Sequence, residues 1–184
     1  MPSTIGIIAG SLRKASFSKK IAQSLLAMAP DDFVFKILDI DGLPVYNQDF
    51  DDDNEVPAAY VALRKELEAM DGFIFITPEH NRSMPAVVKN VLDIGSRPMG
   101  QSKWSGKPGA VFSSSPGSIG GFGANHHLRQ VLVYLNVPTM QQPEIYIPMV
   151  NKVFDDNGEF KTKETKELLE KAVAAYIKWF GKSR

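Results

Sequence analysis

Short apolar runs alternate along this chain with longer stretches whose apolar residues recur at helical spacing. The runs at 4–9, 73–76 and 109–112 are unbroken, which is typical of strands buried on both faces of a parallel sheet. Two further strands are predicted, one over 33–40 and an irregular one formed by Thr139 with residues 144–147. The spacing predicts helices over residues 18–28, 57–70, 85–92, 124–135 and 165–180, and a long polar loop over 41–56.

The resulting order, strand and helix in strict alternation, predicts an α/β fold. Right-handed crossovers between parallel strands place helices on both faces, which gives a three-layer sandwich. Five strands in so short a chain favour a flavodoxin-like sheet of order 2-1-3-4-5. With 184 residues and no repeat, linker or low-complexity segment, residues 1–184 are predicted to form a single domain.

Composition removes several function classes. Lys and Arg number 21, as do Asp and Glu, so there is no general attraction to nucleic acid or anionic membrane. The absence of cysteine excludes disulfides, Cys-ligated metals and thiol catalysis. The N-terminus lacks a basic segment before its apolar run, and no apolar run reaches membrane-spanning length. We therefore expect a soluble, cytoplasmic protein.

In parallel sheets of this kind, ligands bind beyond the carboxyl ends of the strands, so three loops are of interest. The loop at 10–18 precedes a helix, whose N-terminal amides and dipole attract anions. Its hydroxyl and guanidinium donors suit a terminal monophosphate, although an ordinary N-cap has the same composition. It contains neither G-x-G-x-x-G nor G-x-x-x-x-G-K-[ST], which excludes a dinucleotide Rossmann site and a P-loop.

The other two loops differ in character. The loop at 77–85 carries two prolines, which stiffen it and leave the amides between them for a flat heteroaromatic ring. The loop at 113–123 is rich in serine and glycine, so its backbone can approach a ligand closely. Either loop, taken alone, also fits a solvated surface connection.

Four segments of the sequence carry a shared pattern: Gly10-Ser11-Leu12-Arg13 with Ser16 and Ser18, Pro78 to Pro85 followed by Lys89-Asn90 and Asp93, Ser115 to Gly121, and His127-Leu128-Arg129-Gln130. Together they resemble the NAD(P)H-dependent FMN reductase family, and most closely its bacterial quinone and chromate reductase branch. They extend from the first strand to about the fifth.

The resemblance implies non-covalent binding of FMN. It assigns the phosphate to Ser11, Arg13, Ser16 and Ser18. It places the isoalloxazine ring beside Pro78, Glu79, His80, Asn81 and Ser83, and the ring and ribityl chain over Ser113, Ser114, Ser115 and Gly117. It also implies a homodimer or homotetramer with the flavin near a subunit interface.

The implied activity is that of an FMN-dependent NAD(P)H oxidoreductase. A hydride passes from NAD(P)H to flavin N5, and two electrons then pass to a quinone or a similar acceptor such as chromate, an azo or a nitro compound. No side chain is expected as a nucleophile or obligatory base. The alternative is an FMN-binding electron-carrier module without NAD(P)H activity, but such carriers are often strongly acidic and this chain is neutral.

Three positions depart from the family pattern. His80 replaces the usual Tyr, which adds a group able to titrate near neutral pH. Arg82 is expected to bind an anionic substrate or the phosphates of NAD(P)H, if it is more than a solvated charge. Gly123 stands where close relatives often have an interface Arg.

Other classes fit less well. The sequence has no G-x-S-x-G motif, which a serine hydrolase would have. It also has no H-E-x-x-H or H-x-x-x-H pair, which would indicate a metal site. The acidic run at 51–55 lacks the glycine and distal Glu of an EF-hand loop and is interpreted as solvated. A response-regulator-like domain would need acidic residues directly after the first strand, where none occurs.

Overall fold

Five parallel strands form one sheet, in the order β2-β1-β3-β4-β5 that the sequence predicts. The structure is a computed structural model, and it describes residues 1–155 and 157–183. The strands are β1 (Ser3–Ala9), β2 (Phe33–Ile37), β3 (Gly72–Pro78), β4 (Gly109–Ser114) and β5 (Ile145–Ile147). In register, Ile7 pairs with Ile37 and Ile74, and Thr77 pairs with Ser113.

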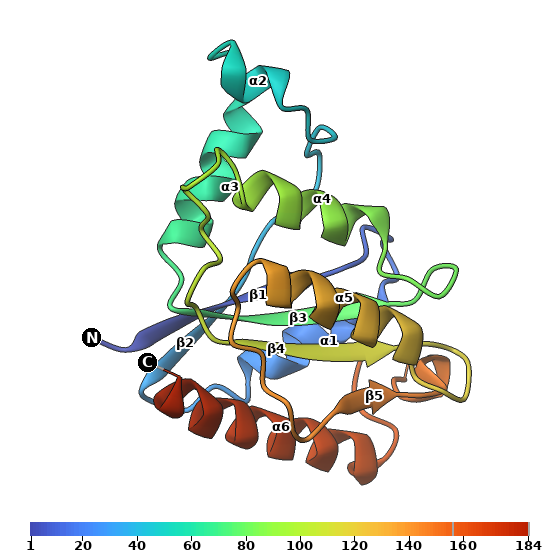
Figure 1. Ribbon diagram of the computed structural model, residues 1–184. Coiled ribbons are helices and arrows are strands. Elements are labelled where there is room, and N and C mark those ends of the chain that lie inside the picture. Colours follow the sequence, from blue (N-terminus) through green and yellow to red (C-terminus); the bar gives the residue numbers. More distant parts are fainter. Residues whose placement is uncertain (156, 184) are drawn as a thin grey trace.

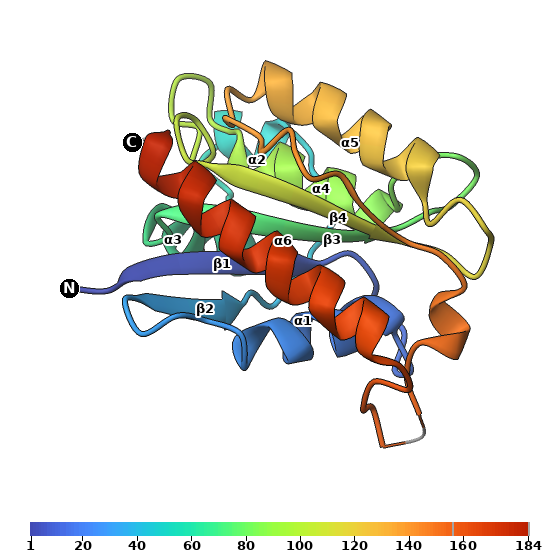
Figure 2. The same cartoon turned by 90° about the horizontal axis from the view of Figure 1, so that it is seen from below.

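Helices cover both faces of the sheet, which confirms the predicted three-layer sandwich. The principal helices are α1 (Phe17–Leu26), α3 (Ala58–Glu68), α4 (Ala86–Gly95), α5 (Phe122–Tyr134) and α6 (Lys163–Lys182). Helices α3, α4 and α5 lie on one face (Figure 1), and α1 and α6 cross the other (Figure 2). Two apolar cores, one on each side of the sheet, hold the layers together.

The strands are buried on both faces because alternate residues enter different cores. In β3, Ile74 and Ile76 pack toward α1 and α6, while Phe73 and Phe75 pack toward α3, α4 and α5. Trp104 fills the second core beside both phenylalanines and donates its indole N–H to the Leu92 carbonyl at 3.0 Å. An unbroken apolar run is thus required at β3.

The structure corrects four details of the predicted elements. Strand β2 ends at Ile37 rather than residue 40, although Leu38 still donates one backbone bond to Ile7. Thr139 makes only an isolated bridge to Gly109: Pro138 directly before it has no N–H, and pairing with β4 resumes only at Ile145. The predicted loop at 41–56 contains a short helix, α2 (Asp49–Asp52), and α6 starts two residues before the predicted position.

A glycine at the end of β1 brings the first loop against its neighbour in the sheet. Gly10 donates its N–H to the Ile76 carbonyl at 2.8 Å. A Cβ at this position would lie 2.6 Å from a Val88 methyl group, so any other residue would force Val88 to shift. The carboxyl ends of β1, β3 and β4 consequently meet at one edge.

In the described ranges, no helix has the length and apolarity needed to cross a membrane.

Candidate functional site

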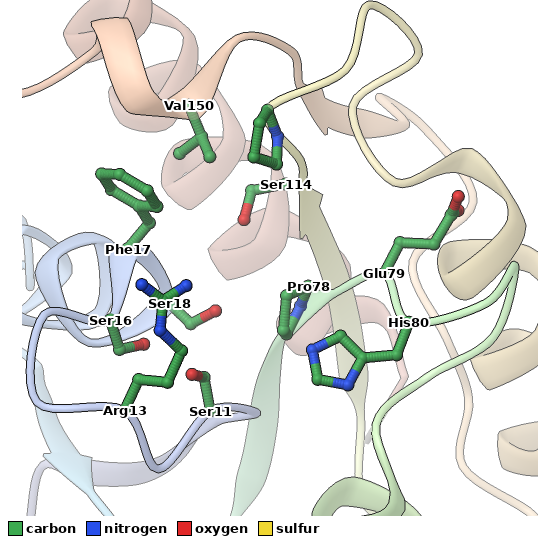
Figure 3. A pocket seen from close by; sticks show the side chains of 11 residues that line it. Ser11, Arg13, Ser16, Phe17, Ser18, Pro78, Glu79, His80, Ser114 and Val150 are labelled. Atoms are coloured by element: carbon green, nitrogen blue, oxygen red, sulfur yellow. The ribbon is translucent and has the colours of Figure 1, made fainter.

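A cavity of about 190 Å³ lies at the edge where β1, β3 and β4 end. The loops after these three strands all contribute to it (Figure 3), as does the segment after β5. Its lining residues are Ser11, Arg13, Ser16, Phe17, Ser18, Pro78, Glu79, His80, Ser114, Pro116 and Val150. The sheet topology therefore brings together parts of all three loops that the sequence singled out.

The serines of the first loop are arranged around the start of α1. Ser16 is the N-cap residue, and its Oγ accepts the Lys19 N–H at 3.2 Å. This bond uses an acceptor site, so the Ser16 O–H proton is left to donate elsewhere. Ser18 Oγ is buried and has no hydrogen-bond partner among the described residues. An unpaired buried hydroxyl costs about 1–3 kcal/mol, which a bound acceptor would recover.

Arg13 completes a set of donors that faces this cavity. Figure 3 shows its guanidinium beside Ser16 and Ser18, with Ser11 on the same side. The first-turn amides of α1 have no carbonyl partner within the helix, and the helix dipole is positive at this end. Hydroxyls, a guanidinium and helix amides converging on one space form a binding site for a phosphate-like anion.

The second loop is a tight turn closed by two backbone bonds. His80 N–H donates to the Ser83 carbonyl and Ser83 N–H to the His80 carbonyl, both at 2.9 Å. Asn81 and Arg82 form the tip with φ values of 50° and 66°, as in a type I′ turn. Pro78 and His80 line the cavity, whereas both tip residues are exposed outside its lining.

The side chains of Glu79 and Ser83 point toward α5. Glu79 Oε2 accepts the Ala124 N–H at 3.0 Å, in the first turn of that helix, and Glu79 Oε1 lies 3.5 Å from the exposed Arg82 guanidinium. Figure 3 shows the Glu79 carboxylate turned away from the cavity. Ser83 Oγ is 2.7 Å from His127 Nδ1. These two side chains anchor the turn to α5.

The third loop contributes less of its side-chain surface than its composition suggests. Ser114 lines the cavity, but Ser113 is fully buried on the α5 side, where its Oγ accepts from the Asn125 amide at 3.2 Å. Ser115 and Gly117 lie outside the lining. They exchange backbone bonds with Ile147 at the end of β5 and with Met149 and Val150 just after it.

Of the predicted phosphate residues, all four line the cavity. Of the predicted ring and ribityl residues, Pro78, Glu79, His80 and Ser114 line it, and Asn81, Ser83, Ser113, Ser115 and Gly117 do not. Sequence reasoning missed Phe17, Pro116 and Val150, which supply the apolar part of the wall. Phe17 lies between two serines of the predicted phosphate loop, and that position could have indicated it. Val150 follows β5, and nothing in its local sequence indicates the site.

The remaining polar clusters have structural roles. Asp51 pairs with Arg64 through two short bonds of 2.6 and 2.8 Å, which hold the pKa of Asp51 below its usual value. His126 Nε2 lies 2.9 Å from the Tyr146 hydroxyl, and burial, followed by the nearby Glu144, raises the pKa of Tyr146 to about 12. Over 1–155 and 157–183, no group of three or more His, Asp and Glu residues is placed to hold a metal ion.

Comparison with known proteins gives one consistent result. Residues 3–152 match the family described as NADPH-dependent FMN reductase. A quinone reductase from Pseudomonas putida is 46% identical over 98% of this chain and 96% of its own length. A 2-hydroxy-1,4-benzoquinone reductase from a Burkholderia species is 44% identical over 97% of each chain. The solved structure of the flavoenzyme NAD(P)H:(acceptor) oxidoreductase FerB from Paracoccus denitrificans superposes with a TM-score of 0.90, at 35% identity and 98% coverage of both chains.

Proposed function

Because the chain belongs to the NADPH-dependent FMN reductase family, we propose that the cavity at the sheet edge is the FMN site of an NAD(P)H-dependent oxidoreductase that reduces quinones. Residues 1–184 would act together as one FMN-binding domain. The observation that carries the assignment is the buried Ser18 hydroxyl, which has no partner in the described chain and faces the same space as Arg13 and Ser16. A terminal phosphate supplies the acceptors that these donors lack.

The phosphate end is held by the first loop. Arg13 offers a planar pair of N–H donors, and Ser11, Ser16 and Ser18 offer hydroxyls around the α1 N-terminus. Phe17 and Val150 close the apolar wall of the cavity behind these donors. We infer that this end fixes FMN affinity, because charge-assisted hydrogen bonds to phosphate are about twice as strong as neutral ones.

The ring end is held by the second and third loops. The turn at 79–83 presents its backbone, since the side chains of Glu79 and Ser83 are engaged on α5. Pro78 and Ser114, neighbours in register on β3 and β4, form the floor of the cavity between the two ends. His80 lies at the wall with its ring exposed, where it can contact the ring system or a bound substrate. Asn81, Ser113, Ser115 and Gly117 belong to the same loops without lining the cavity, so we propose that they support its shape.

When bound, FMN supplies a ring that accepts a hydride from NAD(P)H and returns two electrons to an acceptor. The chain positions that ring and presents hydrogen-bond donors to it. Arg82, 75% exposed at the tip of the turn, places a positive charge where an anionic co-substrate approaches. We propose that it attracts the phosphates of NAD(P)H. No nucleophilic side chain is required for this reaction.

A quinone is the acceptor we favour, because two of the relatives described above are named for quinone reduction. Chromate, azo and nitro compounds are further acceptors to assay. We also propose that the enzyme works in the cytoplasm, where reduced nicotinamide nucleotides are regenerated.

We propose further that the chain forms a homodimer or homotetramer. The outer surface of α5 exposes Phe122, whose ring lies 4.3 Å from that of His126, together with Val133 and Tyr134. Val133 and Tyr134 are 75% and 78% exposed, and exposed apolar patches of this kind mark association surfaces. Light scattering of the wild type and of Val133→Lys tests this, because an unchanged mass in the variant would exclude α5 as the interface.

The FMN site is tested by comparing FMN with riboflavin, which has the same ring and lacks the phosphate. Arg13→Ala is expected to weaken FMN binding by about 1–3 kcal/mol and to leave riboflavin binding unchanged. Arg97→Ala is the matched control, because Arg97 lies outside the cavity lining. If flavin fluorescence gives equal FMN dissociation constants for wild type and Arg13→Ala, this loop does not bind the phosphate.

A further inference from the structure

Helix α5 holds the turn at 79–83 at both of its ends. At one end, the Glu79 carboxylate accepts the Ala124 N–H at 3.0 Å. At the other end, Ser83 Oγ and His127 Nδ1 lie 2.7 Å apart. Ala124 and His127 are three residues apart and therefore lie near one another on the helix surface. One side of α5 thus contacts the turn twice.

The packing between the turn and α5 is close as well as polar. Gly123, in the first turn of α5, lies so near that a Cβ there would be 2.9 Å from the Arg82 carbonyl oxygen and 3.0 Å from Glu79 Oε2. The glycine therefore permits the contact between the helix and the backbone of the turn. The departure from the family pattern at this position has a local structural explanation.

From this arrangement we propose that His127 is a positioning residue for the flavin ring. His127 is exposed and does not line the cavity, so it acts through Ser83. Ser83 is joined to His80 by two backbone bonds of 2.9 Å, and His80 is at the cavity wall. Fixing Ser83 on α5 thereby fixes the backbone that faces the ring. This inference rests on the proposed FMN site and extends it to a residue outside the cavity.

Three variants at one position test the contact. His127→Leu removes the ring nitrogen, and we expect FMN and riboflavin to bind about 3–10-fold more weakly, the value of one neutral hydrogen bond. His127→Asn places an amide group near the position of Nδ1 and should restore most of the affinity. His127→Gln extends its amide toward the position of Nε2 and should not. All three are measured by flavin fluorescence quenching, with circular dichroism as the check on folding.

A double-mutant cycle with Ser83→Ala identifies the route of the effect. If His127 acts through Ser83, His127→Leu will have no further effect in the Ser83→Ala background. The inference is overturned if His127→Leu leaves both affinities unchanged, if Asn restores no more than Gln, or if the loss persists without the Ser83 hydroxyl.

These outcomes are separable from failure of the FMN site itself. An Arg13→Ala variant that binds FMN like the wild type would refute the phosphate assignment, whatever His127 does. Conversely, Arg13→Ala is expected to weaken only FMN, whereas His127→Leu is expected to weaken both flavins, because one acts on the phosphate and the other on the ring. A His127→Leu variant that weakens only FMN would contradict the positioning role.

Discussion

Replacing Arg82 by glycine should stabilise the protein while impairing it as an enzyme. Arg82 has φ 66°, and its neighbour Asn81 has φ 50°. Both are in the left-handed region, where a Cβ approaches the following carbonyl oxygen. Asn tolerates that conformation and Gly is the preferred residue at the second position of a type I′ turn. Arginine, unlike Asn or Gly, is not favoured in this left-handed conformation.

The size of the effect follows from three terms. A left-handed L-residue costs roughly 1–2 kcal/mol, which Arg82→Gly recovers. The greater freedom of glycine in the unfolded chain takes back about 0.5–1 kcal/mol. The lost contact to Glu79 is 3.5 Å long with Arg82 75% exposed, and such pairs contribute about 0–1 kcal/mol at most. Taken at their midpoints, these terms leave a net gain of about 0.3 kcal/mol, or roughly 1 °C in Tm for a chain of this length.

The assay is thermal unfolding of the FMN-free protein, with Arg82→Ala as the matched control. Alanine removes the same charge and keeps the Cβ, so Arg82→Ala should show no rise in Tm. Both variants should raise the KM for NAD(P)H more than they lower kcat, because both lose the guanidinium. A Tm for Arg82→Gly at or below that of Arg82→Ala would refute the strain argument, and an unchanged KM in both would make Arg82 a surface charge only.

Three further predictions concern buried polar groups. Ser18→Ala should raise the Tm of the FMN-free protein and weaken FMN binding, since it removes a hydroxyl with no partner in the described chain; a lower Tm without FMN would contradict this. The pKa of Asp51 is lowered, chiefly by its hydrogen bonds to Arg64. Its contribution to stability is therefore present above 3.8, the pKa in the unfolded chain, and is lost as the pH falls through the lower pKa of the folded protein. Urea unfolding should therefore depend less on pH below 3.8 in Asp51→Asn, and parallel curves would refute the assignment. Tyr176→Phe should cost about 1 kcal/mol in urea unfolding through loss of its bond to the Pro108 carbonyl, and an equally stable variant would show that bond to be dispensable.

The layers of the fold could be predicted because their cause is local. In β3, residues 73–76 are all apolar because both faces of the strand are covered, and this requirement can be seen directly in the sequence. The short helix α2 could not be predicted in this way. It is held by Asp51, whose partner Arg64 belongs to α3, and no local pattern reports an ion pair between elements.

In the candidate site, too, features with a local cause could be predicted from the sequence, and features set by contacts between distant elements could not. The first loop could be singled out because it follows a strand of a parallel sheet and precedes a helix, and its donors do share one cavity. The direction of a side chain was less predictable. Ser113 and Ser114 are adjacent in β4 and point to opposite sides of the sheet, so only Ser114 lines the cavity. The contact of Glu79 with α5 depends on tertiary packing 45 residues away.

The most direct test of the proposed activity is the visible spectrum of the FMN-loaded protein, recorded without oxygen before and after NADPH or NADH is added. We predict flavin absorption bands that bleach on addition of the nucleotide and return when a benzoquinone is supplied. A protein that binds no FMN, or whose bound FMN keeps its absorption with both nucleotides, would contradict the proposed function.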